Sequence, residues 1–167
     1  GGWVSALAVF VDPATGAPRL ACGCWNEEEE AGEVRIYDPV AGGEALVVLD
    51  VGDSVQALAF FADPATGAPR LVCGTSIDYG KSGDVRIFDP VAGGEALVVI
   101  DVGSDVYALV VFADPATGEL RIACGCYDKK VRIYDPVAGG EVLLVLEGNT
   151  ERVRALTVFE DPATGDL

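Results

Sequence analysis

The residues of this chain best suited to chemistry are cysteines and carboxylates. Two Cys-Gly-Cys motifs, Cys22–Cys24 and Cys124–Cys126, place two thiols on one face of a strand, because alternate strand residues point to the same side. Thiols at that spacing are poorly placed for a disulfide, and the two pairs bind a soft metal only if the fold brings them together. We therefore expect these cysteines to be small buried apolar residues, and we predict no metal site.

A run of four acidic residues, Glu27–Glu30, is the other local cluster. Its oxygens suit Ca²⁺ or a basic partner, but no ligand spacing like that of an EF-hand loop accompanies it. A solvated loop of mutually repelling charges is the favoured interpretation.

Catalysis is not expected, because the chain contains no histidine and so lacks the usual general base. Carboxylates are so abundant that any pairing of them is uninformative. The Gly-Gly and Gly-x-Gly sequences lie in turns without a following helix, which argues against a phosphate-binding loop. We predict that the protein is not an enzyme, with no catalytic residues and no cofactor.

The net charge of −16, from 27 acidic and 11 basic residues, limits the partners. It argues against nucleic acid and anionic membrane surfaces, and it leaves basic proteins, peptides or cations. Five cysteines are an odd number, which favours a reducing, cytoplasmic location. The chain begins Gly-Gly without methionine, so we expect an engineered or cleaved N-terminus that hides any targeting signal.

Two sequence patterns recur along the whole chain. The turn sequence DPATG begins at Asp12, Asp63, Asp114 and Asp161, and VRI(Y/F)DPVAGGE begins at Val34, Val85 and Val131. A period of about fifty residues indicates a stacked array or a ring of one supersecondary unit. The pattern predicts a single repeat array over 1–167, with units at 1–52, 53–103, 104–148 and an incomplete fourth at 149–167.

Each unit contains four short β-type runs. The third unit predicts strands at Val106–Phe112, Arg121–Tyr127, Val131–Asp135 and Glu141–Glu147. Their short Pro- and Gly-containing connections predict antiparallel hairpins. Repeated four-stranded antiparallel meanders of this length are typical of β-propeller blades, so we predict an all-β protein with three full blades and one extra inner strand.

The segment Val131–Phe159 resembles the WD-repeat consensus. It has the aromatic-Asp pair Tyr134-Asp135 at the end of the third strand and a Leu-Glu-Gly lead into the next unit. Asp128 matches the Asp that the family uses between the second and third strands, and Gly148-Asn149 stands where the family commonly has Gly-His. The resemblance covers essentially the whole chain and implies the propeller fold.

The departures from the family pattern are systematic. Tyr37, Phe88 and Tyr134 replace the Trp of the WD pair, and there is no His. The family's buried Asp–His–Ser/Thr–Trp hydrogen-bond network therefore cannot form in its usual way. Cys24 and Cys126 stand where that network has its hydroxyl, whereas Thr75 keeps one.

The resemblance also implies that the fourth-to-first and second-to-third connections share one face, the top face, while DPATG and DPVAGG lie on the underside. The underside turns are nearly identical between copies, whereas the top connections differ. A binding surface on the top face is one interpretation, and drift in exposed loops is the other. Under the first, the predicted binding residues are Trp25, Gln56, Tyr79, Tyr107, Tyr127 and Arg154.

The fourth copy of the first strand, Arg152–Phe159, has no partner strand in its own unit. Its apolar residues Val153, Leu156, Val158 and Phe159 would form an aggregation-prone edge. Either the chain is a piece of a longer propeller, or this strand joins a blade of a second copy. We predict a homo-oligomer, most simply a dimer that closes one ring, although a larger ring also fits.

Two functions follow from these patterns. The first is a non-catalytic protein-interaction scaffold that presents its top face to a protein or peptide. The second is an engineered or fragmentary self-assembling repeat module with no ligand of its own.

Overall fold

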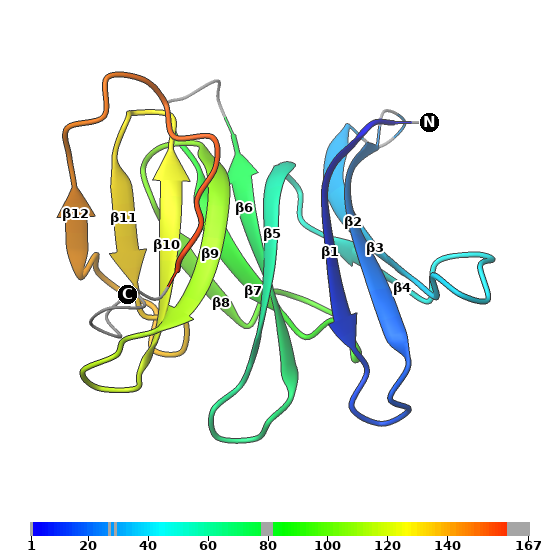
Figure 1. The fold of residues 1–167 in the computed structure, drawn as a ribbon. Helices are drawn as coiled ribbons and strands as arrows, with labels where there is room; N and C mark the ends of the chain where they lie inside the picture. The colour runs from blue at the N-terminus through cyan, green and yellow to red at the C-terminus, as the bar shows by residue number, and fades with distance from the viewer. Residues whose placement is uncertain (1, 27, 29, 78–81, 160–167) are drawn as a thin grey trace.

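The computed structural model describes residues 2–26, 28, 30–77 and 82–159 (Figure 1). These residues form three separate four-stranded antiparallel sheets, in the orders β1-β2-β3-β4, β5-β6-β7-β8 and β9-β10-β11-β12. The strands are β1 Val4–Val11, β2 Pro18–Asn26, β3 Ala31–Tyr37, β4 Val47–Asp50, β5 Ser54–Ala62, β6 Pro69–Ser76, β7 Asp84–Phe88, β8 Val98–Asp101, β9 Val106–Ala113, β10 Leu120–Cys126, β11 Val131–Tyr134 and β12 Leu144–Leu146. No helix in the described part of the chain is long and apolar enough to cross a membrane.

The predicted all-β blade architecture is confirmed: each sheet is one meander, and β1, β5 and β9 lie side by side as the inner strands (Figure 1). The fourth strand of the third blade is shorter than predicted, Leu144–Leu146 instead of Glu141–Glu147. After the Gly-Gly pair the chain bends, and Leu143 N–H donates one hydrogen bond of 2.8 Å to the Ile133 carbonyl before the ladder begins.

The two repeated turns of each blade are joined by an arginine at the start of the second strand. In blade 2, Arg70 binds Asp63 of DPATG at 2.9 Å and Asp89 of DPVAGG at 3.3 Å. The turn itself is held by Asp63, whose carboxylate accepts the Ala65 N–H at 2.9 Å. The equivalent arginines are Arg19, bound to Asp12 and Asp38, and Arg121, near Asp114 and Asp135. Both turns therefore lie on one side of the molecule, the underside.

The blades pack on one another through a glycine in each second strand. A Cβ on Gly74 would lie 2.7 Å from Cγ1 of Val106, the first valine of the next blade. Gly23 meets Val55 in the same way. Only a residue without a side chain admits the neighbouring inner strand so closely. Two apolar cores result, one between blades 1 and 2 and the other between blades 2 and 3.

The same surfaces are exposed at the two ends of the array. Leu7 in β1 is 62% exposed, whereas the equivalent Leu58 packs into the core between blades 1 and 2. At the other end Leu146 in β12 is 47% exposed, whereas the equivalent Leu49 and Ile100 are 1% and 2% exposed. Each end face is therefore half of a blade–blade interface.

The predicted extra strand lies extended against blade 3, where the inner strand of a fourth blade belongs, beside β9 and β10 (Figure 1). Val153 N–H donates to the Cys126 carbonyl at 3.0 Å, and Val153 packs on Gly125 as Val106 does on Gly74. Leu156 joins the apolar cluster of blade 3, Val158 is half-buried, and Phe159 is 74% exposed. The segment makes no ladder of its own, because no second strand follows it among the described residues.

Candidate functional site

A β-bulge at the top of each inner strand positions a residue that differs in every copy of the repeat. Val55 pairs with Thr75 and Ala57 pairs with Gly74, so that Gln56 between them has no ladder partner. Blades 1 and 3 have the same irregularity at Ser5 and Tyr107. A bulge re-aims the side chain of its extra residue. The three inner strands therefore present Ser5, Gln56 and Tyr107 at equivalent points of the top face.

The bulge residues have different local partners. Ser5 Oγ is bonded to the backbone carbonyl of Val55, and Gln56 Nε2 donates to Ser54 Oγ at 2.9 Å. Tyr107 OH lies 3.4 Å from Asp105 Oδ2. Burial and the Asp105 carboxylate raise the pKa of Tyr107, so this hydroxyl stays protonated at neutral pH.

Blade 3 has an aromatic pair covered by a cation. The ring centroids of Tyr107 and Tyr127 are 6.1 Å apart. The Cζ of Arg152, the residue before Val153, lies 5.0 Å from the Tyr127 centroid. A guanidinium within about 6 Å of an aromatic face makes a favourable cation–π contact.

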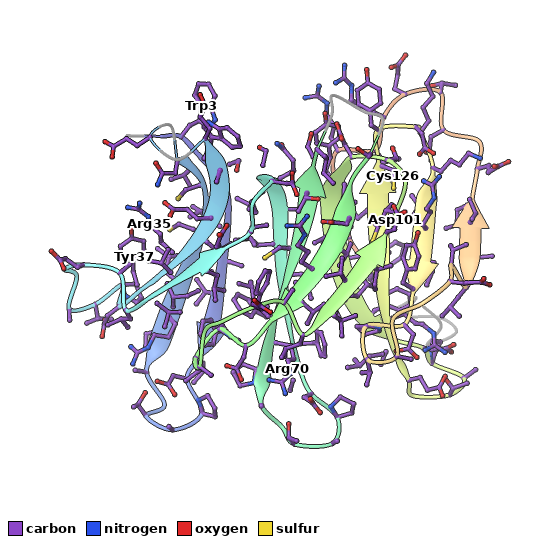
Figure 2. All side chains as sticks on the ribbon, turned by 180° about the vertical axis from the view of Figure 1, so that it is seen from behind. Trp3, Arg35, Tyr37, Arg70, Asp101 and Cys126 are labelled. Atoms are coloured by element: carbon purple, nitrogen blue, oxygen red, sulfur yellow. The ribbon has the colours of Figure 1, made fainter. Side chains whose placement is uncertain are left out.

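A pocket of about 560 Å³ opens on the top face, between blade 1 and the segments that enter the inner strands of blades 2 and 3. We call the segment that enters the inner strand of a blade the lead of that blade. Trp3 and Trp25 come from blade 1, Gln56 from β5 and Tyr107 from β9, with Glu30 also lining it. Trp3 is 70% exposed, and Figure 2 shows it at the end of the molecule opposite Arg70. The pocket combines aromatic faces with carboxylate and amide groups, a composition that suits binding.

A buried polar network supports this face in blade 2. Thr75 Oγ1 donates to Asp84 Oδ1 at 2.6 Å, and Asp84 Oδ2 accepts from Arg86 Nε at 3.0 Å. Arg86 also binds Asp53 at 2.5 Å and the Val51 carbonyl, which fixes the connection into β5. The hydroxyl of Thr75 is therefore used, in a network that Arg86 completes.

The other two blades vary this network around the same arginine position. In blade 1, Arg35 binds Glu33 at 2.6 Å. In blade 3, Arg132 binds Asp128 at 2.6 Å and lowers the pKa of that carboxyl. Cys24 and Cys126 replace the hydroxyl, and each thiol contacts the carbonyl two residues before it at 3.4 Å, from Cys22 and Cys124.

All five cysteines are free, and all but Cys24 are buried. Burial raises the pKa of each thiol, so they are weak nucleophiles at neutral pH. Within the described residues, no group of three or more Cys, Asp or Glu side chains is arranged to hold a metal ion. The cysteines pack as apolar residues, as the sequence indicates.

The structure brings three of the six predicted binding residues into one pocket: Trp25, Gln56 and Tyr107. Tyr127 lies beside Tyr107, and Arg154 is exposed on the terminal segment. Tyr79 lies outside the described residues, as do Glu27 and Glu29 of the acidic run.

Sequence reasoning missed Trp3 and Asp53, which also line the pocket. Alignment of the copies could have found Trp3, because it precedes the first valine just as Ser54, Asp105 and Arg152 do. Nothing in the local sequence pointed to Asp53, since its place depends on the ion pair with Arg86.

Comparison with known proteins identifies the fold. No family model matches the chain, and no curated protein matches it. Sqt1 of Saccharomyces cerevisiae superposes with a TM-score of 0.60 at 16% identity, over 88% of this chain and 36% of Sqt1. BBS1N, solved in complex with ARL6DN, superposes with a TM-score of 0.63 at 16% identity, over 90% of this chain and 40% of BBS1N. Both are β-propeller proteins, and this chain spans well under half the length of each. The similarity shows that the three sheets are blades of a β-propeller.

Proposed function

We propose that this protein is a non-catalytic protein-interaction scaffold of the WD-repeat type, with the top face as its binding surface. The observation that carries the proposal is the difference between the two faces. The underside places an arginine beside the same two turn aspartates in every blade. The top bulges instead carry Ser5, Gln56 and Tyr107, of which the last two line an open aromatic pocket. Aromatic residues among polar ones are frequent anchors of protein interfaces.

The similar propeller BBS1N, solved with ARL6DN bound, supports a protein partner for a fold of this kind. The partner surface comprises Trp25, Gln56, Tyr107 and Tyr127, joined by Tyr79 and Arg154 as the sequence predicts. Charge supports a basic protein or peptide over nucleic acid, since the chain carries a net −16. We place this role in the cytoplasm, as free cysteines suggest.

A second copy closes the ring in this proposal. The two end faces are complementary halves of the interface that already occurs twice inside the chain, between blades 1 and 2 and between blades 2 and 3. Leu7 and Leu146, exposed at opposite ends, would pack into such an interface as Leu58 and Leu49 do. Such head-to-tail interfaces form rings when the rotation between copies closes.

The terminal segment gives this assembly an inner strand to exchange. Val153 and Leu156 already occupy the inner-strand position beside blade 3, so the second strand of a partner's first blade would pair with this segment or with its own β1. Two chains bring six complete blades and two such competing segments. A dimer is therefore the expected assembly.

Light scattering or sedimentation at several concentrations tests the assembly. We expect twice the chain mass of 17.3 kDa. A mass equal to one chain at every concentration would reject closure by a second copy, and the ring would then need blades from elsewhere.

The alternative is a self-assembling repeat module without a ligand, which the near identity of the copies favours. Substituting Tyr107→Ala and Arg154→Ala separates the two functions. A scaffold should lose captured partners in these variants while its assembled mass stays unchanged. A module without a ligand should capture nothing specific with either sequence.

A further inference from the structure

The residue before the first valine of each inner strand lies near the end of the preceding blade's second strand. In blade 3 that strand ends beside Tyr127, and the following lead residue, Arg152, places its guanidinium over the ring. In blade 1 the equivalent of Tyr127 is Trp25, and the equivalent of Arg152 is Ser54. The chain thus has two equivalent aromatic positions, of which one faces an arginine and the other a serine.

The backbone brings the lead of blade 2 close to Trp25. Trp25 pairs with Gly32 across the sheet, and a Cβ on Gly32 would collide with the carbonyl oxygen of Asp53. Ser54 and Trp25 both line the same pocket. The serine side chain is too short to cover an indole face, so space remains where the longer arginine lies in blade 3.

The walls of that pocket match a cation. Trp3, Trp25 and Tyr107 supply aromatic faces, and tryptophan is the strongest cation–π partner among side chains. Asp53 is neutralised by Arg86, but Glu30 is exposed at the rim and the whole chain is strongly acidic. Negative potential over such a cleft attracts positively charged ligands.

We propose that this pocket binds an arginine side chain of a basic peptide, in the arrangement that Arg152 makes with Tyr127. This specifies the ligand chemistry of the scaffold proposed above and rests on that function. A guanidinium stacked on Trp25 would have Glu30 within the same pocket and Gln56 as a polar neighbour. A neutral isostere keeps the shape of arginine but loses the cation–π contact.

The chain contains two tryptophans, and both line this pocket, so intrinsic fluorescence reports on it directly. The probe is a heptapeptide of glycine and serine with one central arginine, titrated against the same peptide with citrulline. We expect saturable changes in tryptophan emission, with citrulline binding weaker by about fivefold or more. Equal binding of the two peptides would overturn the proposal.

A substitution that supplies the missing side chain gives the sharpest control. Ser54→Arg should place a guanidinium over Trp25 from within the chain and compete with the peptide, so binding should fall by about fivefold or more. Ser54→Gln, of similar length but uncharged, should bind more tightly than Ser54→Arg. Full affinity in Ser54→Arg would contradict the proposal.

Folding and assembly are checked on the same samples by melting temperature and light scattering. If arginine selectivity is absent while the assembled mass and the capture of partners are intact, the ligand chemistry is wrong and the scaffold function stands. If partner capture also ignores the Tyr107 and Arg154 substitutions, the scaffold function itself fails.

Discussion

The two ends of each blade use arginine–carboxylate pairs in different ways. On the underside, the arginine of the second strand lies between two turn aspartates, as Arg70 binds Asp63 and Asp89. In blade 3 the equivalent Arg121 lies 4.0 and 3.9 Å from its two aspartates and binds Glu119 at 2.5 Å. On the top face, the arginine of the third strand has a different acidic partner in each blade, for example Asp84 in blade 2 and Asp128 in blade 3. The underside therefore keeps an arginine between the same two turns, while the top face varies the acidic partner of its arginine on a conserved backbone arrangement.

Burial also separates the two ends. In blade 2, Thr75 is fully buried and the Asp84 side chain is 11% exposed, whereas the Asp89 side chain on the underside is 27% exposed. A charge removed from water depends on its partner far more than a charge that water can reach. We therefore expect the top network of blade 2 to matter more for stability than the underside pairs do.

The largest effect should come from Arg86→Met. The change leaves the buried Asp84 carboxylate without its cation and removes the ion pair that holds Asp53, in the connection into β5. We expect a loss of about 2–3 kcal/mol in the free energy of unfolding, at or below the lower end for a broken buried pair because Arg86 is partly exposed. Urea unfolding measures it.

Arg70→Met is the matched control for that experiment, because the same change then falls at the other end of the same blade. It breaks the pairs with Asp63 and Asp89, whose carboxylates keep their turn hydrogen bonds. Its destabilisation should be clearly smaller. Equal losses in the two variants would show that the comparison between the faces is wrong.

A smaller effect is expected from Thr75→Val. Valine keeps the shape of threonine but removes the hydroxyl that donates to Asp84 Oδ1 and accepts the Asp84 N–H at 3.0 Å. Leaving these buried groups unsatisfied should cost about 1–2 kcal/mol, again measured by urea unfolding. Thr75→Ser, which keeps the hydroxyl, should lose less; a valine variant as stable as the parent would exclude a structural role for the network.

The sequence predicts the blades well because their signals are local. Pro and Gly end the strands, and alternating Val, Ile and Leu fill them, so the three blades could be derived from a single copy. The arginine that joins the two underside turns could not, because its contacts Asp63 and Asp89 lie 7 and 19 residues away and on different turns. Such a pair becomes visible only once the strand register is known.

The candidate site is predicted less completely than the fold. Variation between copies pointed to Gln56 and Tyr107, and the structure adds the reason, a bulge that re-aims them. Trp3 was not predicted because it lies before the first strand. Its equivalence to Ser54 and Asp105 appears only when the segments before the inner strands are aligned. The resemblance supplied the top face, but the pocket depends on how three blades pack together.

Lowering the pH should reduce the free energy of unfolding, because the carboxylates of the underside turns become protonated. The backbone N–H of Ala65 and the guanidinium of Arg70 lower the pKa of Asp63 below 3.8. A carboxyl whose pKa is depressed by folding stabilises the protein above the unfolded value, and this contribution is lost as the pH falls through the folded value. Asp63→Asn should therefore flatten the fall of the urea midpoint below about pH 4.

The exposed Glu44, changed to Gln, is the control for that titration and should leave the acid slope unchanged. The effect of Asp63→Asn will be a fraction of the whole slope, because Asp12 and Asp38 have lowered pKa values from similar turn contacts. A slope identical to that of the parent would mean that the turn aspartates are not linked to folding.

The mildest test modifies thiols without changing any residue. Cys24 and Cys126 are equivalent in the repeat, yet Cys126 is fully buried in the core between blades 2 and 3, whereas Cys24 is half-buried at the open end of blade 1. The thiolate is the reactive form, and burial raises the pKa of both thiols. At low protein concentration, iodoacetamide should therefore modify Cys24 several times faster than Cys126, as mass spectrometry of peptides would show.

The same modification tests the assembly. A second copy packed on blade 1 would bury Cys24 as blade 2 buries Cys126, so the modification rate of Cys24 should fall to that of Cys126 when the assembled mass doubles. If the mass doubles while Cys24 stays reactive, the chains associate through some other face, and the end faces of the array remain open.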